Sequence, residues 1–316
     1  MRDRNSPAPI MGYQGSPSAH RMIDMSKIGS AEGSGVRGHA QYLAGHEPIA
    51  EWYRHQLAAR YDPLLKTHNL GMDQGANLGI DIANSKGDVR PVVADLQDHI
   101  DNLQQKQKEG DTALWIKNQI KDSQNMINYL NDPNRFKGHM YQLAIDRPAE
   151  HFLDWEKPLS EQSDYVKEKL KPMIEAMDKR MMADREDQLA KAKERLARAP
   201  AGVLQQKLEN DVKRLSQPID WDNMKGQQLY EMAAQHSLGR VPRDINEGYP
   251  ISSQYLRAKG LAGVKYEAGT IHKRQQGHTN YATFEPPRIL KRYAIPGMVG
   301  SGLVGTVLAG KGQNGS

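Results

Sequence analysis

A long helical middle separates two ends of the chain that are rich in glycine and in short apolar clusters. Residues 12–45 have the composition of strands and loops. Residues 91–216 instead contain runs in which apolar side chains recur every three or four positions, which is typical of amphipathic helices. After residue 218 the mixed pattern returns. This order predicts an α+β fold in which helices are inserted into one domain whose two ends meet.

The sequence divides into five segments. Residues 1–11 form a flexible, proline-rich lead-in, and residues 12–90 form the first half of the domain, with a helix over 46–61 and a long loop over 66–90. In that helix, Ile49, Trp52, Tyr53, Leu57 and Tyr61 share one face, which we expect to be buried. The remaining segments are a mainly helical insertion over 91–218 with a strand at 138–146, the second half of the domain over 219–293, and an apolar C-terminal helix or tail over 294–316.

The inserted region predicts a projecting arm. Residues 161–198 are strongly helical, with Ser160 as the expected N-cap, and the turn RAPAG leads into a return helix that carries Leu204, Leu208 and Leu215. Basic and acidic residues alternate along both helices, so their outer faces are expected to be solvated. The same mixture argues against nucleic acid as a specific partner.

The C-terminal segment 294–310, AIPGMVGSGLVGTVLAG, contains no charged residue. It is slightly shorter than the roughly 20 residues that cross a bilayer. Gly297, Ser301, Gly305 and Ala309 recur at every fourth position and would give one helix face on which another backbone can pack closely. Membrane contact, contact with other copies, and a flexible tail are the three interpretations.

Composition excludes several kinds of site. The chain has 316 residues and no cysteine, which excludes disulfides and thiol catalysis. Its histidines are scattered without the spacing of metal ligands, so we expect no metal. The net charge of +5 permits anionic partners without requiring them.

Three separated segments resemble one family of domains. The first contains YQGSP, KIGSAEGSG and GHAQYLAG; the second reads MYQLAID and then FLDWEKPLSEQ; the third joins SSQYLRAKGLAGVKYEAG to GHTNYATFEP. In this order they are similar to the ADP-ribosyltransferase-like domains of bacteriophage large polyvalent proteins, which are distantly similar to poly(ADP-ribose) polymerases and diphtheria-type toxins. The resemblance covers nearly all of 12–293, and the arm at 171–216 is its least similar part.

The resemblance implies a split antiparallel β core that binds NAD and no metal, with a large helical insertion. By position, the family's first-strand histidine corresponds to Gln14, its stacking tyrosine to Tyr42 and its late-strand glutamate to Asn280, and these are the implied catalytic residues. The implied NAD-binding residues are Tyr13, Gln14, Gly15, Ser16 and Tyr42. In such enzymes the glycosidic bond breaks through an oxocarbenium-like centre, which preorganised hydrogen bonds and negative charge stabilise.

Two of the three implied catalytic positions depart from the family. Gln14 can still donate and accept hydrogen bonds at a ribose hydroxyl. Asn280 supplies no carboxylate, and loss of one preorganised electrostatic partner costs about 100- to 1000-fold in rate. Glu32, Glu267 and Glu285 are alternative acids, although an ordinary strand-end or loop carboxylate is the commoner role.

These departures lead to two hypotheses of function. We favour a phage internal or accessory protein with an ADP-ribosyltransferase-like fold and weak or no activity, packaged in the virion interior or ejected with the genome. It would contact copies of itself, other virion proteins or, through 294–310 after ejection, a membrane. The alternative is an active NAD-dependent mono-ADP-ribosyltransferase that modifies a host protein in the host cytoplasm.

Overall fold

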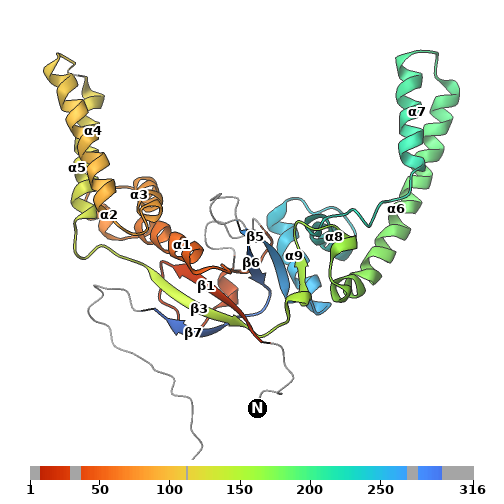
Figure 1. Ribbon diagram of the computed structural model, residues 1–316. Helices are drawn as coiled ribbons and strands as arrows, with labels where there is room; N and C mark the ends of the chain where they lie inside the picture. The colour runs from red at the N-terminus through yellow and green to blue at the C-terminus, as the bar shows by residue number, and fades with distance from the viewer. Residues whose placement is uncertain (1–7, 29–36, 112, 269–276, 294–316) are drawn as a thin grey trace, which may run out of the picture.

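The computed structural model describes residues 8–28, 37–111, 113–268 and 277–293, and in this part of the chain two small sheets lie between groups of helices (Figure 1). The first sheet is antiparallel and has the order β1–β3–β7. The second has the order β2–β6–β5–β4 and is antiparallel except for its β4–β5 pair. The strands are β1 (Ile10–Ser16), β2 (Gln41–Leu43), β3 (His139–Ile145), β4 (Phe152–Asp154), β5 (Gly263–Ala268), β6 (His278–Thr283) and β7 (Arg288–Arg292). The predicted α+β class is confirmed.

Each sheet combines strands from both ends of the chain. In the first sheet β3 lies between β1 and β7, and in the second Tyr42 of β2 is paired with Ala282 of β6. The two sheets are joined where Tyr13 and Ala44 exchange backbone hydrogen bonds of 2.8 and 2.9 Å. The ends of the chain therefore meet, as the order of the sequence patterns predicts.

The helices cover one side of each sheet. α1 packs on β1 and is covered by α3, while α8 and α9 enclose the main core with the second sheet (Figure 1). That core includes Leu229, Tyr230, Leu256 and Val264, which are fully buried. The helices are α1 (Glu47–Arg60), α2 (Leu64–Thr67), α3 (Met72–Asn84), α4 (Arg90–Lys108), α5 (Leu114–Leu130), α6 (Asp164–Arg198), α7 (Val203–Ser216), α8 (Gly226–Leu238) and α9 (Ile245–Ala258).

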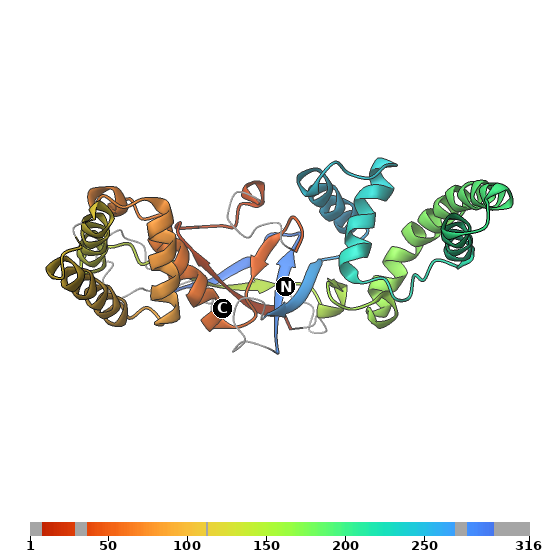
Figure 2. The same ribbon diagram turned by 90° about the horizontal axis from the view of Figure 1, so that it is seen from above.

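Two helical hairpins project from opposite ends of the molecule. α4 and α5 form the first arm, and α7 with the distal part of α6 forms the second (Figure 1). Seen from above, the two arms flank the sheets on either side (Figure 2). The sequence indicated only the second arm as a projection, because the charge mixture of 161–198 is more conspicuous than that of 91–130.

The loop predicted over 66–90 is wrong, because most of this segment is helical. Its glycines, which suggested a loop, are contact points between helices. A Cβ on Gly75 would lie 2.8 Å from the carbonyl oxygen of Ala59, and a Cβ on Gly79 would lie 2.5 Å from that of Gln56. α3 therefore needs glycine where it crosses α1 closely.

Two predicted helix starts are also wrong. α6 is capped by Ser163, whose hydroxyl accepts the Val166 N–H at 3.2 Å, and not by Ser160. The segment SSQYLRAKG predicts a short helix capped by Ser252 or Ser253, but α9 begins at Ile245, seven residues before Ser252. Ser252 and Ser253 are buried inside that helix and donate hydrogen bonds of 2.6 and 2.7 Å to the carbonyl oxygens of Tyr230 and His39. The helix also runs through Pro250.

Candidate functional site

Tyr42, Tyr266 and Asn280 lie together on one face of the second sheet. Tyr266 of β5 is the direct partner of Asn280 in β6, and Tyr42 is the partner of Ala282, two positions along β6 on the same face. The rings of Tyr42 and Tyr266 meet edge to face, with their centroids 6.3 Å apart. The structure therefore brings together two of the three implied catalytic residues and adds Tyr266.

Asn280 is held in place by its neighbours. Its side chain is buried, and its Oδ1 accepts the backbone N–H of Gly45 at 3.2 Å. The Asn280 side chain also forms a hydrogen bond with the hydroxyl of Tyr266. The pKa of that hydroxyl is raised well above its usual value, first by burial and then by the nearby hydroxyls of Tyr42 and Tyr53, so Tyr266 is a neutral hydrogen-bonding group.

The ring of Tyr42 is fixed by its hydroxyl group. This hydroxyl donates to the carbonyl oxygen of Gly38 at 2.7 Å and accepts the backbone N–H of Arg37 at 2.9 Å. The segment before β2 is thus folded back onto the sheet. A ring held in this way offers a rigid apolar edge, which costs little conformational entropy when a ligand binds.

Arg37 and Glu156 add an ion pair beside the tyrosines. The Arg37 guanidinium lies 5.8 Å from the ring centroids of both Trp155 and Tyr266, and its Nε is 3.7 Å from Oε1 of Glu156. Burial raises the pKa of Glu156, and the charge of Arg37 only partly opposes this effect. No motif in the sequence indicates this pair, because the two residues come from loops far apart in the chain.

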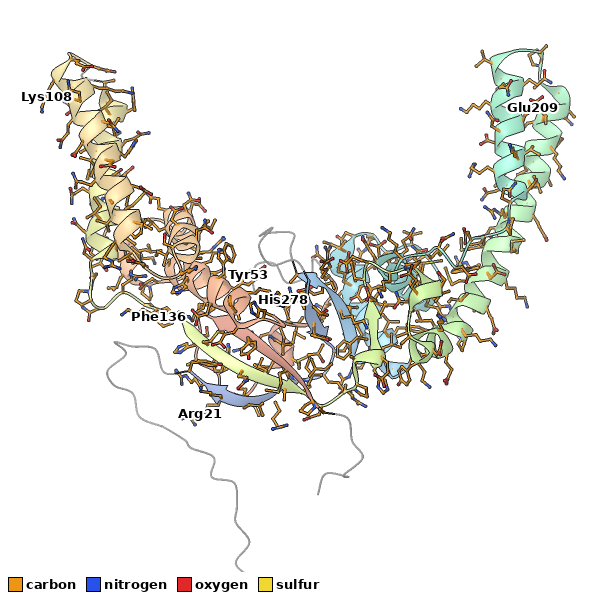
Figure 3. The ribbon with its side chains drawn as sticks, viewed as in Figure 1. Arg21, Tyr53, Lys108, Phe136, Glu209 and His278 are labelled. Carbon is orange, nitrogen blue, oxygen red and sulfur yellow. The ribbon has the colours of Figure 1, made fainter. Side chains whose placement is uncertain are left out.

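Tyr53 reaches the same region from α1. The predicted apolar face of this helix is partly wrong: Ile49, Ala50, Ala58 and Ala59 are the buried apolar residues, whereas 36% of Tyr53 is exposed. Small side chains form the buried stripe because α1 lies against Gly15 of β1. Tyr53 lies at the flank of α1 (Figure 3), and its hydroxyl is close enough to raise the pKa of Tyr266.

The Gln14 side chain does not join this group. Tyr13 packs beside Ala44, and the missing Cβ of Gly15 would point at the backbone of α1, so alternation along β1 directs Gln14 to the opposite face. There Gln14 is paired with Tyr141, and its buried Oε1 has no hydrogen-bond partner among the residues that the structure describes.

The neighbouring hydroxyl, that of Ser16, is engaged locally. Its Oγ lies 2.9 Å from Nε2 of His20 and accepts the backbone N–H of Ser18 at 3.1 Å. Of the five implied NAD-binding residues, only Tyr42 has its side chain beside Tyr266 and Asn280. Tyr13 is connected to this region through its backbone hydrogen bonds with Ala44.

The alternative acids are less well placed than Glu156. Glu285 forms two hydrogen bonds of 2.8 and 3.0 Å with Arg147, and both residues line a hollow of about 300 Å³ away from the tyrosines. Glu267 follows Tyr266 on β5 and so points to the other face, where it accepts the Gly277 N–H at 3.2 Å. Glu32 lies outside the described residues.

The described residues contain no group of three or more histidine and carboxylate side chains suited to a metal ion. In the same ranges, no helix combines the length and the apolarity that a membrane span requires. The segment 294–310, for which membrane contact is one of three interpretations, lies outside the described residues.

The arrangement provides aromatic surface and one amide on a single sheet face, with a partly exposed ion pair beside them. Such a set can hold a flat heterocycle and hydrogen-bond a sugar or an amide. Comparisons of the chain with protein-family models, with curated proteins and with solved structures returned no match.

Proposed function

We propose that the protein is an ADP-ribosyltransferase-like bacteriophage protein that binds a nicotinamide nucleotide and has weak or no transferase activity. The proposed binding site is the tyrosine group, which consists of Tyr42, Tyr53 and Tyr266. In this proposal Tyr42, Tyr53 and Tyr266 provide aromatic surface for the nicotinamide ring. The side-chain amide of Asn280 provides a hydrogen bond to the ribose.

One observation carries the proposal. Tyr42 and Asn280 come from segments more than two hundred residues apart, yet they lie side by side on one face of a sheet built from both ends of the chain. The resemblance in sequence selects these two positions independently of the coordinates. This agreement supports a shared site.

The expected weakness of the reaction follows from the chemistry at position 280. Cleavage of the bond to nicotinamide develops positive charge on the ribose, and a carboxylate stabilises that charge. Asn280 is neutral, and its Oδ1 already accepts the Gly45 N–H. Binding can therefore persist where catalysis is reduced.

A titration with NAD tests the binding step. Tyr53→Ala should weaken binding about tenfold, because stacking of a heterocycle on one aromatic side chain contributes ~1–3 kcal/mol. Tyr61→Ala is the matched control, since Tyr61 caps the same helix and is 40% exposed, but has no described interaction with Tyr266. A thermal shift or a change in tryptophan fluorescence reports binding. Absence of binding by the parent chain at about 1 mM NAD would refute the proposal.

The ion pair Arg37–Glu156 favours the alternative, an active mono-ADP-ribosyltransferase. Glu156 places a carboxyl group near Tyr266, and its ionised form, which the charge of Arg37 favours, could supply the negative charge that Asn280 lacks. If the chain transfers ADP-ribose or releases nicotinamide, Glu156→Gln should abolish that activity and Glu161→Gln, on an exposed turn, should not. If the parent chain has neither activity, the first proposal stands and the alternative is refuted.

The biological setting is part of the same proposal and rests on the resemblance. The protein would reside in the virion interior and reach the host cytoplasm on ejection, with other virion proteins or copies of itself as partners and a host protein as the target if it is active. Detection of the chain in purified particles tests this setting. Its presence only in infected-cell extract would contradict packaging.

A further inference from the structure

We infer that the tips of the two helical arms are a bipartite surface that binds an anionic lipid membrane. We define the first tip as residues 106–111 with 113–121, and the second tip as residues 191–207. The inference does not depend on the proposed nucleotide site, which lies on the sheets between the arms.

Each tip exposes a pair of large apolar side chains. The first pair, Leu114 and Trp115, is 72% and 48% exposed, and it opens helix α5. The second pair, Val203 and Leu204, is 88% and 53% exposed, and it opens helix α7. The same arrangement thus occurs in two arms of unrelated sequence, at the first two positions of the returning helix. Neither pair packs against a core cluster.

Exposed positive charge surrounds both pairs. The first tip has four lysines and two acidic residues, and the second has five basic residues and one acidic residue. Lys191 forms an ion pair of 2.6 Å with Asp187, which lies outside the second tip, and Arg198 forms one of 2.7 Å with Glu194. The other basic side chains of this tip are also exposed: Lys193, Arg195 and Lys207. Apolar side chains flanked by basic residues suit the interface of a membrane with anionic headgroups.

The two tips point the same way. Both arms rise on the same side of the sheets and end far from them (Figure 1), and side chains project from both ends near Lys108 and Glu209 (Figure 3). One flat surface can therefore meet both tips together. Attachment at two points strengthens weak single contacts by making the second contact intramolecular.

The small size of each pair favours lipid over a protein partner. A stable protein interface buries about 800 Å² of surface on each partner, whereas two side chains expose only roughly a few hundred Å². A bilayer requires no shape complementarity and accepts isolated Leu and Trp side chains at its interface. An anionic membrane is thus the binding partner that these tips fit.

The absence of native cysteine gives a direct test. The full chain is prepared as Leu114→Cys, as Leu204→Cys and as the control Val241→Cys, each labelled with an environment-sensitive fluorophore. Val241 is 70% exposed but lies between α8 and α9, away from the tips. Each protein is mixed with phosphatidylcholine vesicles that contain about 30% phosphatidylserine, and with vesicles of phosphatidylcholine alone.

We expect a blue shift and a rise in fluorescence at 114 and 204 with the anionic vesicles, and no change at 241. Raising the salt from about 0.1 M to about 0.5 M should weaken the response, because the headgroup attraction is screened. In flotation of unlabelled protein, Val203→Ser with Leu204→Ser should lower vesicle binding about tenfold or more, as should Leu114→Ser with Trp115→Ser. Val241→Ser with Ile245→Ser should leave it unchanged.

Three outcomes would overturn the inference. The chain does not bind the vesicles, or it binds them without a response at 114 and 204, which would assign binding to another segment. In the third outcome, the tip substitutions abolish a concentration-dependent association of the chain with itself, and vesicle binding is unaffected. The substituted side chains are exposed, so thermal melts of the variants should match that of the parent.

Discussion

The contact between Gly15 and α1 sets the position of the helix that carries Tyr53, and replacing this glycine is a stringent test of the fold. A Cβ at position 15 would lie 2.2 Å from the carbonyl oxygen of Ala50 and 2.5 Å from the backbone nitrogen of Arg54. Unstrained contacts between heavy atoms occur at about 3.5 Å. Gly15→Ala must therefore move β1 and α1 apart by about 1 Å or more.

The cost lies at the upper end of the usual range for overpacking. Extra methyl groups in a packed core cost about 1–3 kcal/mol and sometimes more. Here the opposing atoms belong to the helix backbone and cannot rotate away as a side chain would. We expect Gly15→Ala to lower the free energy of unfolding by about 3 kcal/mol, which corresponds to a Tm lower by roughly 6–12 °C for a domain of this size.

Thermal unfolding followed by circular dichroism measures this change. Gly71→Ala is the control, because a Cβ at position 71 meets its nearest atom, Oε1 of Gln74, at 3.6 Å. Its effect should stay below about 1 kcal/mol. Gly15→Ala should also weaken NAD binding, since the displaced helix carries Tyr53. A Gly15→Ala protein that melts within about 2 °C of the parent would refute the close packing of β1 and α1.

Two further predictions concern β1 and β3. Gln14→Leu should raise the free energy of unfolding by about 1 kcal/mol, because it removes a buried oxygen without a partner; a loss of stability in urea unfolding would show that the oxygen is satisfied. Burial, and then Arg292, lower the pKa of His139 to about 4, and His139 Nδ1 accepts from Arg292 at 2.9 Å. The folded state thus disfavours protonation, and roughly 2 kcal/mol of stability should be lost between pH 7 and pH 5. His139→Gln should remove that loss, and an unchanged pH profile in this variant would assign it to other groups.

Local patterns located most of the strands and helices but not their burial. Tyr141, Leu143 and Ile145 alternate along the predicted strand at 138–146, which indicated a half-buried strand. All three are buried, and so are Met140 and Ala144 on the other face. Alternation fails here because the second face of β3 is covered by α1, and the sequence of β3 alone contains no signal for a helix that packs on it.

Glycine was the most misleading residue type. Gly75 and Gly79 lowered the helical tendency of 72–84 when judged locally, since glycine costs ~1 kcal/mol in a helix relative to alanine. Tertiary contact outweighs that cost, because only glycine lets α3 approach the backbone of α1 at these points. Such a preference depends on a neighbour in space, and single-sequence periodicity cannot supply it.

At the candidate site, the order of motifs along the chain predicted which residues lie together, but it did not predict the direction of every side chain. Tyr42 and Asn280 were selected by the order of motifs along the chain, and strand pairing places them on one face. Tyr53 was assigned to the core because it lies four residues after Ile49, although the alanines of α1 form the buried stripe. Gln14 was grouped with Tyr42 by motif, although alternation along β1 turns its side chain to the other face. Under the proposed function, the departure from the family's histidine at Gln14 lies away from Tyr42, whereas Asn280 stands beside Tyr42 where the resemblance implies a carboxylate. Under the proposed function, the neutral amide of Asn280 is the feature that would limit transferase chemistry.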